Sequence, residues 1–460
     1  MNAIAPPLHR GMKELERSAF KKVIKTLAIK VPTKQVGLAK KSFQDDLFNQ
    51  PRLRNVEPDP SSKETKLVLL NLGVQNAGKQ MRLPWSRELL ILIRFEAENL
   101  SKEKQEFLQQ HNWELVQHEL ELDYNFWTAE QILHAVMPED STDIPSSFTQ
   151  VGHIAHMNLR ENYYPWKHLI GEVILDKNKN ITTVVNKTNS IDTTFRFFKM
   201  EILAGKDDMI AEVKESGCKF KFDFSKVYWN SRLHTEHDRL VQLFKPNEYV
   251  CDVFAGVGPF ALPAAKKGSI VYANDLNPSS YEYMKENIKH NKITSGIFPY
   301  NMDGRAFIKQ AVKDLQATSA DEWKTFDHFV MNLPATAIDF LDAFRGLYHD
   351  QKDLFNASAR AKLPMIHCHC FTKSSDAMQD ISERVGQIMG GKPDISKSSV
   401  HWVRNVAPKK DMYCISFPLS SDIAFAATPV SHNSNNNSEK RKLEDISASA
   451  SGHQKTPRLE

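Results

Sequence analysis

The chain has 460 residues, which is long enough for two or three domains with full hydrophobic cores. No stretch approaches the roughly 20 consecutive apolar residues of a membrane span, so the sequence predicts a soluble protein, and its few cysteines, five in all, favour reduced thiols in a reducing compartment. The formal net charge of +4 at pH 7 is compatible with an RNA partner but does not require one.

Residues 1–41 are rich in lysine and arginine and nearly free of acidic residues, which predicts a basic N-terminal extension. We expect a helix from Lys13 to Ala28 within it. The segment has no long apolar run of the kind found in secretory signals. It is compatible with a mitochondrial presequence and equally with a solvated basic helix that begins a domain.

Residues 42–136 mix patterns of both kinds of secondary structure. A strand is expected at Lys66–Leu72, an apolar run covers Glu88–Phe95, and a charged helix is expected at Leu100–His111. This mixture predicts a small α+β domain. Residues 137–147, rich in proline, aspartate and serine, are interpreted as a linker.

The next block, residues 148–230, is predicted to be a compact β-rich domain. Its opening string, VGHIAHMNLR at Val151–Arg160, alternates apolar and polar residues as a strand does and leaves Arg160 at the end of an edge. A helix is expected at Lys167–Leu175. Further strands are expected at Thr182–Lys187, Thr194–Leu203, Met209–Glu215 and Cys218–Asp223.

Residues 231–426 carry the strongest pattern in the chain. A helix at Ser231–Leu243 leads to the string YVCDVFAGVGPFAL, in which an apolar run ends at Gly256 and Gly258 and continues into a helix-compatible segment. A strand, a tight glycine turn and a helix bind nucleotides, because the glycines allow positive φ and close approach of the backbone. The pattern predicts an α/β domain of the Rossmann-like kind.

A second apolar run, Ser269–Asn274, ends in Asp275, and Leu276 follows. A carboxylate at this distance from the glycine loop grips ribose hydroxyls in doubly wound folds, so we expect both residues to contact a nucleotide cofactor. The loop also satisfies the dinucleotide pattern G-x-G-x-x-G/A. A nicotinamide cofactor is therefore left open at this point.

Three features favour S-adenosyl-L-methionine as the cofactor. Asp252 lies near the carboxyl end of the first strand, where it can face the methionine ammonium but would sit badly beside a pyrophosphate. A third strand ends before Asp303 and Gly304, which offer an acid beside an adenine ring. A fourth strand, Phe326–Met331, ends in Asn332-Leu333-Pro334, which resembles the Asn-x-Pro element of base-modifying methyltransferases.

The residue after this element bears on the target atom. Enzymes that methylate an exocyclic amine usually follow Asn/Asp-Pro-Pro with an aromatic residue that stacks on the flipped base, whereas here Ala335 follows. An endocyclic nitrogen is therefore the better hypothesis.

Further elements are expected after Asn332, and the last of them is predicted to close the sheet. They are a helix at Ala337–Phe344, a strand at Met365–Cys370, a helix at Ser375–Ile388 and a strand at Asp411–Pro418. The His and Cys side chains of HCHC at residues 367–370 should alternate between opposite faces of a strand, so we predict no metal site. Residues 427–460 are Ser/Asn/Lys-rich and are interpreted as a disordered tail, in which KRK at 440–442 is compatible with a nuclear import signal or a solvated segment.

Five strings together resemble the eukaryotic and archaeal tRNA (guanine-N1)-methyltransferase family, which acts on the guanosine 3′ of the anticodon, tRNA position 37. They are VGHIAHMNLR, EILAG at Glu201–Gly205, VYWNSRLHTEHDRL at Val227–Leu240, DVFAGVGPF at Asp252–Phe260 and MNLPATAIDFL at Met331–Leu341. The resemblance covers most of the chain before the tail. It implies a class I methyltransferase domain, the β-rich domain beside it, and an N-terminal domain that touches the tRNA elbow.

The resemblance also implies roles for individual residues. Guanine N1 carries a proton at neutral pH, so methyl transfer to it requires a base, for which Glu236 is the candidate. Arg160 would stabilise the charge that develops on O6, and Asn332 would hold the base edge. His237, where archaeal members have arginine, is interpreted as lining the cofactor pocket. Without the motifs, Glu236 would read as a helix-dipole partner and Arg160 as a surface ion pair.

Three alternatives stay open from the sequence. They are a transferase that moves the aminocarboxypropyl group of the same cofactor to the same nucleoside, a nicotinamide enzyme, and a tRNA-binding protein without catalysis. Intact Asp252, Asp275, Asp303, Asn332, Glu236 and Arg160 argue against the last. We expect a monomer, located in the cytoplasm, the nucleus or the mitochondrial matrix, with the division among them open.

Overall fold

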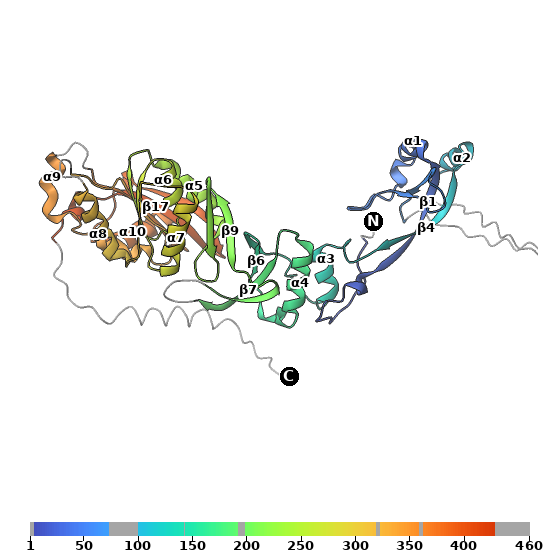
Figure 1. Cartoon of the computed structure of the whole chain (residues 1–460), viewed down its shortest axis with the longest axis horizontal. Helices are drawn as coiled ribbons and strands as arrows, with labels where there is room; N and C mark the ends of the chain where they lie inside the picture. Colours follow the sequence, from blue (N-terminus) through green and yellow to red (C-terminus); the bar gives the residue numbers. More distant parts are fainter. Residues whose placement is uncertain are drawn as a thin grey trace, which may run out of the picture. The chain divides into compact units, whose positions relative to one another are not determined.

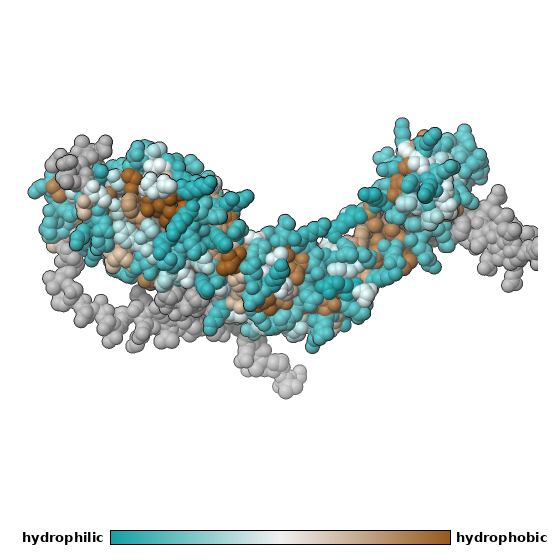
Figure 2. Space-filling model, viewed as in Figure 1, coloured by the Kyte–Doolittle hydropathy of each residue, from teal (hydrophilic) through white to brown (hydrophobic). Residues whose placement is uncertain are grey.

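A computed structural model describes residues 4–72, 100–141, 143–191, 198–318, 323–357 and 362–427. The chain divides into two compact units, of which the first contains Met1–Ser190 and Phe198–Met209 and the second contains Ile191–Phe197 and Ile210–Glu460. On both units the visible surface is mainly hydrophilic, with hydrophobic residues gathered in separate patches (Figure 2). None of the helices within the described ranges is long and apolar enough to cross a membrane.

The first unit begins with an antiparallel sheet in the order β2-β3-β1-β4. Its strands are β1 (Lys22–Pro32), β2 (Val56–Pro58), β3 (Thr65–Leu69) and β4 (Glu114–Leu122). The helices and 3-10 turns around it are η1 (Arg17–Phe20), η2 (Thr33–Gln35), α1 (Val36–Ser42), η3 (Gln44–Asp46), α2 (Lys102–Gln110) and α3 (Ala129–Val136). The predicted strand at 66–72 and helix at 100–111 are confirmed, and the apolar run at 88–95 lies outside the described residues.

The helix predicted from Lys13 to Ala28 is wrong. Residues 22–28 instead begin β1, which lies between β3 and β4 and contributes Ala28 and Ile29 to buried clusters on its two faces. Pairing on both sides with neighbouring strands outweighs the local helical pattern, because Val23, Ile24 and Thr26 fit a pleated surface well. The basic segment before residue 42 is thus part of a folded sheet.

The rest of the first unit is a second sheet, in the order β5-β6-β7-β8, with two helical segments. Its elements are β5 (Thr149–Val151), β6 (Ile154–Met157), η4 (Glu161–Trp166), α4 (Lys167–Lys177), β7 (Thr183–Ile191) and β8 (Phe198–Gly205). The predicted helix at 167–175 and all four predicted strands are confirmed, the first two of them as β7 and β8. The last two, β9 (Ile210–Glu215) and β10 (Cys218–Asp223), form a separate hairpin that groups with the second unit.

The second unit contains a seven-stranded sheet in the order β13-β12-β11-β14-β15-β17-β16. Its strands are β11 (Tyr249–Asp252), β12 (Ile270–Asn274), β13 (Ile297–Tyr300), β14 (His328–Met331), β15 (Met365–Thr372), β16 (Ser399–Ala407) and β17 (Lys410–Pro418). The first five are parallel, and β17 runs antiparallel to β15 and to β16. The predicted Rossmann-like fold is confirmed.

One strand of this sheet was not predicted. β16 is largely exposed and polar, HWVRN at its centre, so it lacks the apolar run that marks the buried parallel strands. It lies at the edge, beyond β17. The strand predicted to close the sheet, β17, therefore lies inside it.

Helices cover both faces of the sheet. They are η5 (Ser231–Leu233), α5 (His234–Leu243), α6 (Ala261–Lys266), α7 (Pro278–His290), α8 (Gly304–Ala317), η6 (Ala337–Phe344), η7 (His349–Gln351), α9 (Lys352–Ala357), α10 (Ala377–Met389), η8 (Ile395–Lys397) and α11 (Ser421–Ala424). Figure 1 labels β17 of this sheet and helices of the same unit, among them α6, α7, α8 and α10. Cys368 and Cys370 of β15 face a core formed with α8, η6 and α10. His367 and His369 face the other side, where α5 lies, so the predicted alternation of HCHC is confirmed.

Candidate active site

The order of the strands places the candidate site. From β11 the chain continues through β12 and β13 to one edge of the sheet and then through β14 and β15 toward the other, so the order reverses between β11 and β14. In open α/β sheets, ligands bind beyond the carboxyl ends of the strands at such a reversal. Asp252 ends β11 and Asn332 follows β14, so both residues lie at the carboxyl ends of neighbouring parallel strands, where such a crevice is expected.

The two glycines of the loop between β11 and α6 have different surroundings. Gly256 has a φ of +57°, and a Cβ built there would have no atom within 4 Å. Gly258 has a φ of +96°, and its Cβ would lie 2.2 Å from the Leu262 side chain. Gly256 therefore leaves room for a ligand to approach the backbone, while Gly258 allows the loop to pack on its own helix.

Asp275, after β12, holds the loop from the side. Its two carboxylate oxygens accept hydrogen bonds from the backbone N–H groups of Gly256 and Asn277, each at 2.9 Å. Burial raises the pKa of Asp275 to about 6, against the lowering effect of these two bonds. The adjacent Leu276 is 47% exposed, so it offers apolar surface beside the carboxylate.

Asp252 is the most unusual side chain of the crevice. It is completely buried, and neither carboxylate oxygen has a hydrogen-bond partner of good geometry within the described part of the chain. Burial and the nearby charge of Asp275 raise its pKa to about 8, despite smaller lowering effects of the Phe254 backbone and of His369. A buried carboxylate without a cation nearby is costly, so this site suits a cationic ligand.

The remaining predicted cofactor residues lie around the same strand ends. The Asn332 side-chain oxygen is buried with no hydrogen-bond partner among the described residues. Asp303 is exposed and caps α8 by accepting from the backbone N–H groups of Arg305 and Ala306. At Gly304 a Cβ would lie 2.9 Å from the Phe254 ring, so only glycine fits.

These residues fit S-adenosylmethionine. Asp252 supplies an anion for an ammonium, Asp275 a carboxylate for hydroxyl groups, Gly256 an open backbone, and Leu276 apolar surface for a base. A pyrophosphate would add negative charge beside Asp252 and Asp275. The crevice therefore favours a cationic nucleoside over a dinucleotide.

Glu236, in the first turn of α5, lies in a second polar cluster on the α5 face of the sheet. Arg239, one turn later, donates from Nε and Nη2 to its two oxygens at 2.7 and 2.8 Å. His369 of β15 donates from Nε2 to Glu236 Oε1 at 2.7 Å, because a carboxylate can only accept. His401 of β16 lies 3.7 Å away, and Cys414 lies within 4.8 Å.

This cluster keeps Glu236 ionised. Although burial acts to raise the pKa of the Glu236 carboxyl, Arg239 and His369 lower it to about 2. Glu236, His369 and Cys414 are donor types that metals use, yet the Arg239 guanidinium already places a positive charge against the carboxylate. We therefore assign a hydrogen-bonded cluster rather than a metal site.

The two other predicted residues have different surroundings. The His237 side chain is buried, bonds Glu215 of β9 through Nδ1, and meets the edge of the Phe260 ring beside the glycine loop. Arg160 precedes η4 in the first unit, is 70% exposed, and pairs with Asp143 at 2.9 Å. The roles predicted for both stay predictions.

Sequence analysis missed Arg239, His369, Cys414 and His401. Arg239 could have been found, since three residues after a glutamate in a helix is the spacing of an ion pair. The others lie on strands that come more than a hundred residues later in the chain. No local pattern marks them as partners of Glu236.

The strand order and the glycine crevice define a Rossmann-like class I methyltransferase. Residues 211–355 match the sequence model of the TRM5/TYW2 methyltransferase domain, and residues 129–208 match that of the TYW2 N-terminal domain. The chain is 46% identical over 457 residues to the tRNA (guanine(37)-N(1))-methyltransferase of Batrachochytrium dendrobatidis, covering 92% of each chain. It is 45% identical to that of Schizosaccharomyces pombe, covering 91% of this chain and 96% of the relative. The chain belongs to the tRNA (guanine(37)-N(1))-methyltransferase family.

Solved structures share the fold at lower identity. Trm5b from Pyrococcus abyssi superposes with a TM-score of 0.55 at 24% identity, covering 85% of this chain and 99% of that one. The aTrm5 chain solved in complex with tRNALeu gives a TM-score of 0.57 at 21% identity, covering 86% and 100%. The similarity therefore extends over both units rather than the methyltransferase sheet alone.

Proposed function

We propose that this protein transfers a methyl group from S-adenosylmethionine to N1 of guanosine 37 in tRNA. The observation that carries the proposal is the pairing of an unpartnered Asp252 and Asn332 at the reversal of the sheet with an ionised Glu236 on the α5 face. Relatives at 40–46% identity that bear the name of this activity support the choice of nucleoside and atom.

Within this proposal the chain's own residues bind and orient. S-adenosylmethionine, when bound, supplies the methyl group. Asp252 holds its ammonium and Asp275 its ribose hydroxyls, with Leu276, Asp303 and Gly304 around the adenine. Asn332 holds the edge of the guanine, and its unpartnered oxygen is available for that bond.

The proton on guanine N1 must leave for N1 to accept a methyl group. Glu236 is the proposed acceptor, because it is ionised and bonds His369, whose ring lies beside the Phe260 ring at the end of the glycine loop. Loss of this proton increases the negative charge on O6. Arg160 is the proposed partner of that charge, which a guanidinium stabilises well.

The test is mass spectrometry of nucleosides from a tRNA transcript with guanosine 37, incubated with the full chain and methyl-labelled S-adenosylmethionine. We expect labelled N1-methylguanosine, and none when adenosine replaces guanosine 37. A heavier adduct would select aminocarboxypropyl transfer. This alternative is tested because the matching family models are named for TYW2 as well as for TRM5. Tight tRNA binding without any adduct would select a binding protein.

The role of Arg160 has a separate test with a matched control. Arg160→Ala should lower turnover by about 10²-fold and leave tRNA affinity largely intact, because an oxyanion partner acts on the transition state. Asp143→Asn removes the ion pair without removing the guanidinium and should keep most activity. Equal losses in the two variants would show that the ion pair, rather than the guanidinium, is what matters.

The monomeric state and the cellular location stay predictions. Size-exclusion chromatography with light scattering would check the former. KRK at 440–442 lies outside the described residues. Fluorescence microscopy of the tagged protein, with and without these three residues, would measure their effect on its cellular distribution. An unchanged distribution would remove the import signal from the proposal.

A further inference from the structure

His369 is a buried histidine that the sequence gives no reason to connect with the reaction. Its side chain is fully buried on β15, and its Nε2 donates to Glu236 Oε1 at 2.7 Å. The two residues are 133 positions apart in the chain. Nε2 carries a proton toward the Glu236 carboxylate, and Nδ1 has no hydrogen-bond partner of good geometry among the described residues.

Glu236 has a second partner of a different kind. Arg239 forms a two-pronged ion pair with the same carboxylate, and its side chain is 28% exposed, whereas His369 has no exposed surface. A two-pronged pair fixes the plane of a carboxylate. With the bond from His369, Oε1 accepts two hydrogen bonds and Oε2 accepts one, so Oε2 keeps more capacity to accept a further proton. The carboxylate is thus oriented by groups from one helix and one strand.

We propose that His369 and Arg239 are positioning residues for the reaction, which hold the Glu236 carboxylate ionised and aimed at guanine N1. This inference rests on the function proposed above. Neither residue needs to touch the substrate, because each acts through Glu236. His369 supplies the fixed contact from the sheet, and Arg239 supplies the more accessible one from α5.

The charge balance of the cluster supports the inference. Burial alone would raise the pKa of the Glu236 carboxyl, and the two partners reverse that effect. Burial also acts to lower the pKa of His369, while Cys414 and Glu236 raise it, with a net rise. His401, 48% exposed on β16, also faces Glu236, and Asp252 interacts with His369 from the crevice. Removal of His369 should therefore make Glu236 easier to protonate.

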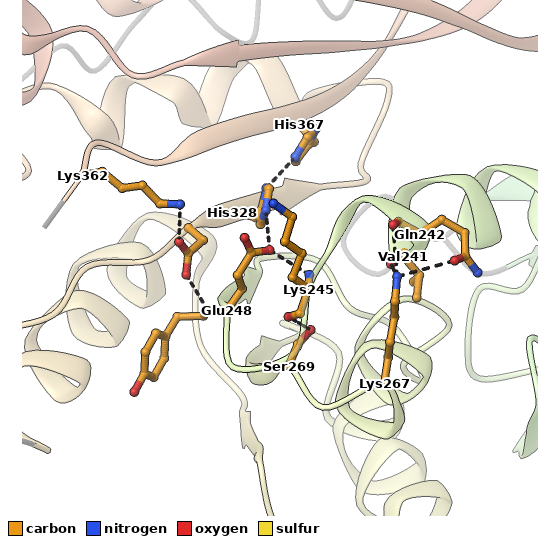
Figure 3. A network of polar contacts seen from close by, with 11 residues as sticks. Val241, Gln242, Lys245, Glu248, Lys267, Ser269, His328, Lys362 and His367 are labelled. Carbon is orange, nitrogen blue, oxygen red and sulfur yellow. Dashed lines mark hydrogen bonds and ion pairs between the residues drawn. The ribbon is translucent and has the colours of Figure 1, made fainter. Parts of the chain in front are cut away.

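His367 provides a matched control on the same strand and the same face. Its Nδ1 bonds Ser416 at 2.7 Å. Its Nε2 bonds His328 at 3.1 Å, and His328 bonds Glu248 at 3.2 Å (Figure 3). It is nearly as buried as His369. A substitution here perturbs β15 similarly while leaving the bonds to Glu236 in place.

The experiment measures the single-turnover rate of N1-methylguanosine formation from pH 5 to pH 9, with the full chain, saturating cofactor and a guanosine-37 transcript. His369→Phe should slow the reaction by about 10²-fold at pH 7 and should introduce a loss of rate at acid pH that the wild type lacks. His369→Gln keeps an N–H donor and should recover to within about tenfold of the wild type. His367→Gln should stay within about threefold, with an unchanged pH profile.

Arg239→Gln gives a second reading if His369→Phe does not fold, since Arg239 is partly exposed. It should also bring an acid loss of rate into the measured range. S-adenosylhomocysteine binding and thermal unfolding of each variant report on the crevice and the fold. Equal impairment by His369→Gln, His369→Phe and His367→Gln, or an unshifted pH profile in the slow variants, would overturn the inference. A wild type that forms no N1-methylguanosine would instead overturn the proposed function and the inference with it.

Discussion

Asp252 and Glu236 are two buried carboxylates of the same unit with opposite surroundings. Asp252 has no hydrogen-bond partner of good geometry among the described residues, and its pKa is raised to about 8. Glu236 accepts three hydrogen bonds from two side chains, and its pKa is lowered to about 2. One carboxylate therefore lacks a counter-charge that the other receives from the chain itself.

The difference indicates two ways of using buried charge. A carboxylate whose partner is a ligand must be left without a partner by the protein, at a cost to the stability of the free protein. A carboxylate that acts on a proton must stay ionised between turnovers, which internal cations ensure. The surroundings of each carboxylate thus report what it acts on.

The largest expected effect is the loss of reaction rate on substitution of Glu236. Glu236→Gln should lower the single-turnover rate by at least about 10²-fold, because the amide cannot take the N1 proton. Cofactor and tRNA affinities should stay within a few-fold of the wild type, as measured by calorimetry and filter binding. A comparable loss of cofactor affinity would show that Glu236, like Asp252, binds the cofactor, and the two carboxylates would then not differ in role.

Asp252→Ala should act on binding rather than on the proton. We expect S-adenosylmethionine affinity to fall by about 10²-fold, because the ammonium would enter a buried pocket without an anion. Calorimetry measures the change, with Asp350→Ala as a control at an exposed aspartate that has no proposed role in cofactor binding. A smaller loss for Asp252→Ala than for the control would assign the ammonium to another residue.

Cofactor affinity should depend on pH through Asp252. With its pKa raised to about 8 in the free protein, Asp252 is largely protonated at pH 6, and binding the ammonium requires the proton to leave. Affinity should therefore rise by about tenfold or more from pH 6 to pH 7.5. Asp252→Asn should flatten this dependence. A wild type with equal affinity across that range would show that the carboxyl is already ionised without ligand.

The smallest expected effect is on the stability of the free protein, and it has opposite signs at the two carboxylates. Because the pKa of Asp252 is raised from 3.8 to about 8, the folded protein loses stability progressively as pH rises from about 4 to about 8. Asp252→Asn should therefore stabilise the protein at pH 8 by about 1–3 kcal/mol and much less at pH 4. Because the pKa of Glu236 is lowered, its contribution is present above pH 4.5 and is lost as pH falls toward 2. Glu236→Gln should therefore destabilise at neutral pH. Denaturant unfolding of both variants and the wild type, at neutral to slightly alkaline pH and at pH 4, measures the sign of each change in the free energy of unfolding.

The sequence predicted that the candidate cofactor residues lie at strand ends, because each of these positions is marked by a local pattern. Asp252, Asp275 and Asn332 each follow an apolar run, and the carboxyl ends of parallel strands meet at one edge of the sheet. Chain order alone therefore placed them together. The prediction for residues 22–28 failed for the opposite reason. These residues form a strand because they pair with β3 and β4, which come later in the chain.

The Glu236 cluster could be predicted only in part. The helix and its Arg239 are readable from a few consecutive residues. The contact with His369 depends on how α5 lies across β15, which is set by packing rather than by spacing. The same holds for His401, since β16 has too little apolar character to be recognised as a strand.

The position of β17 has a consequence for how the protein is made. This strand inserts between β15 and β16 and carries Cys414 beside Glu236, although residues 411–418 are among the last of the folded unit to leave the ribosome. The strands that form the crevice are synthesised well before it. In a nascent chain, the strands whose ends carry the candidate cofactor residues thus leave the ribosome before the strand that completes the surroundings of Glu236.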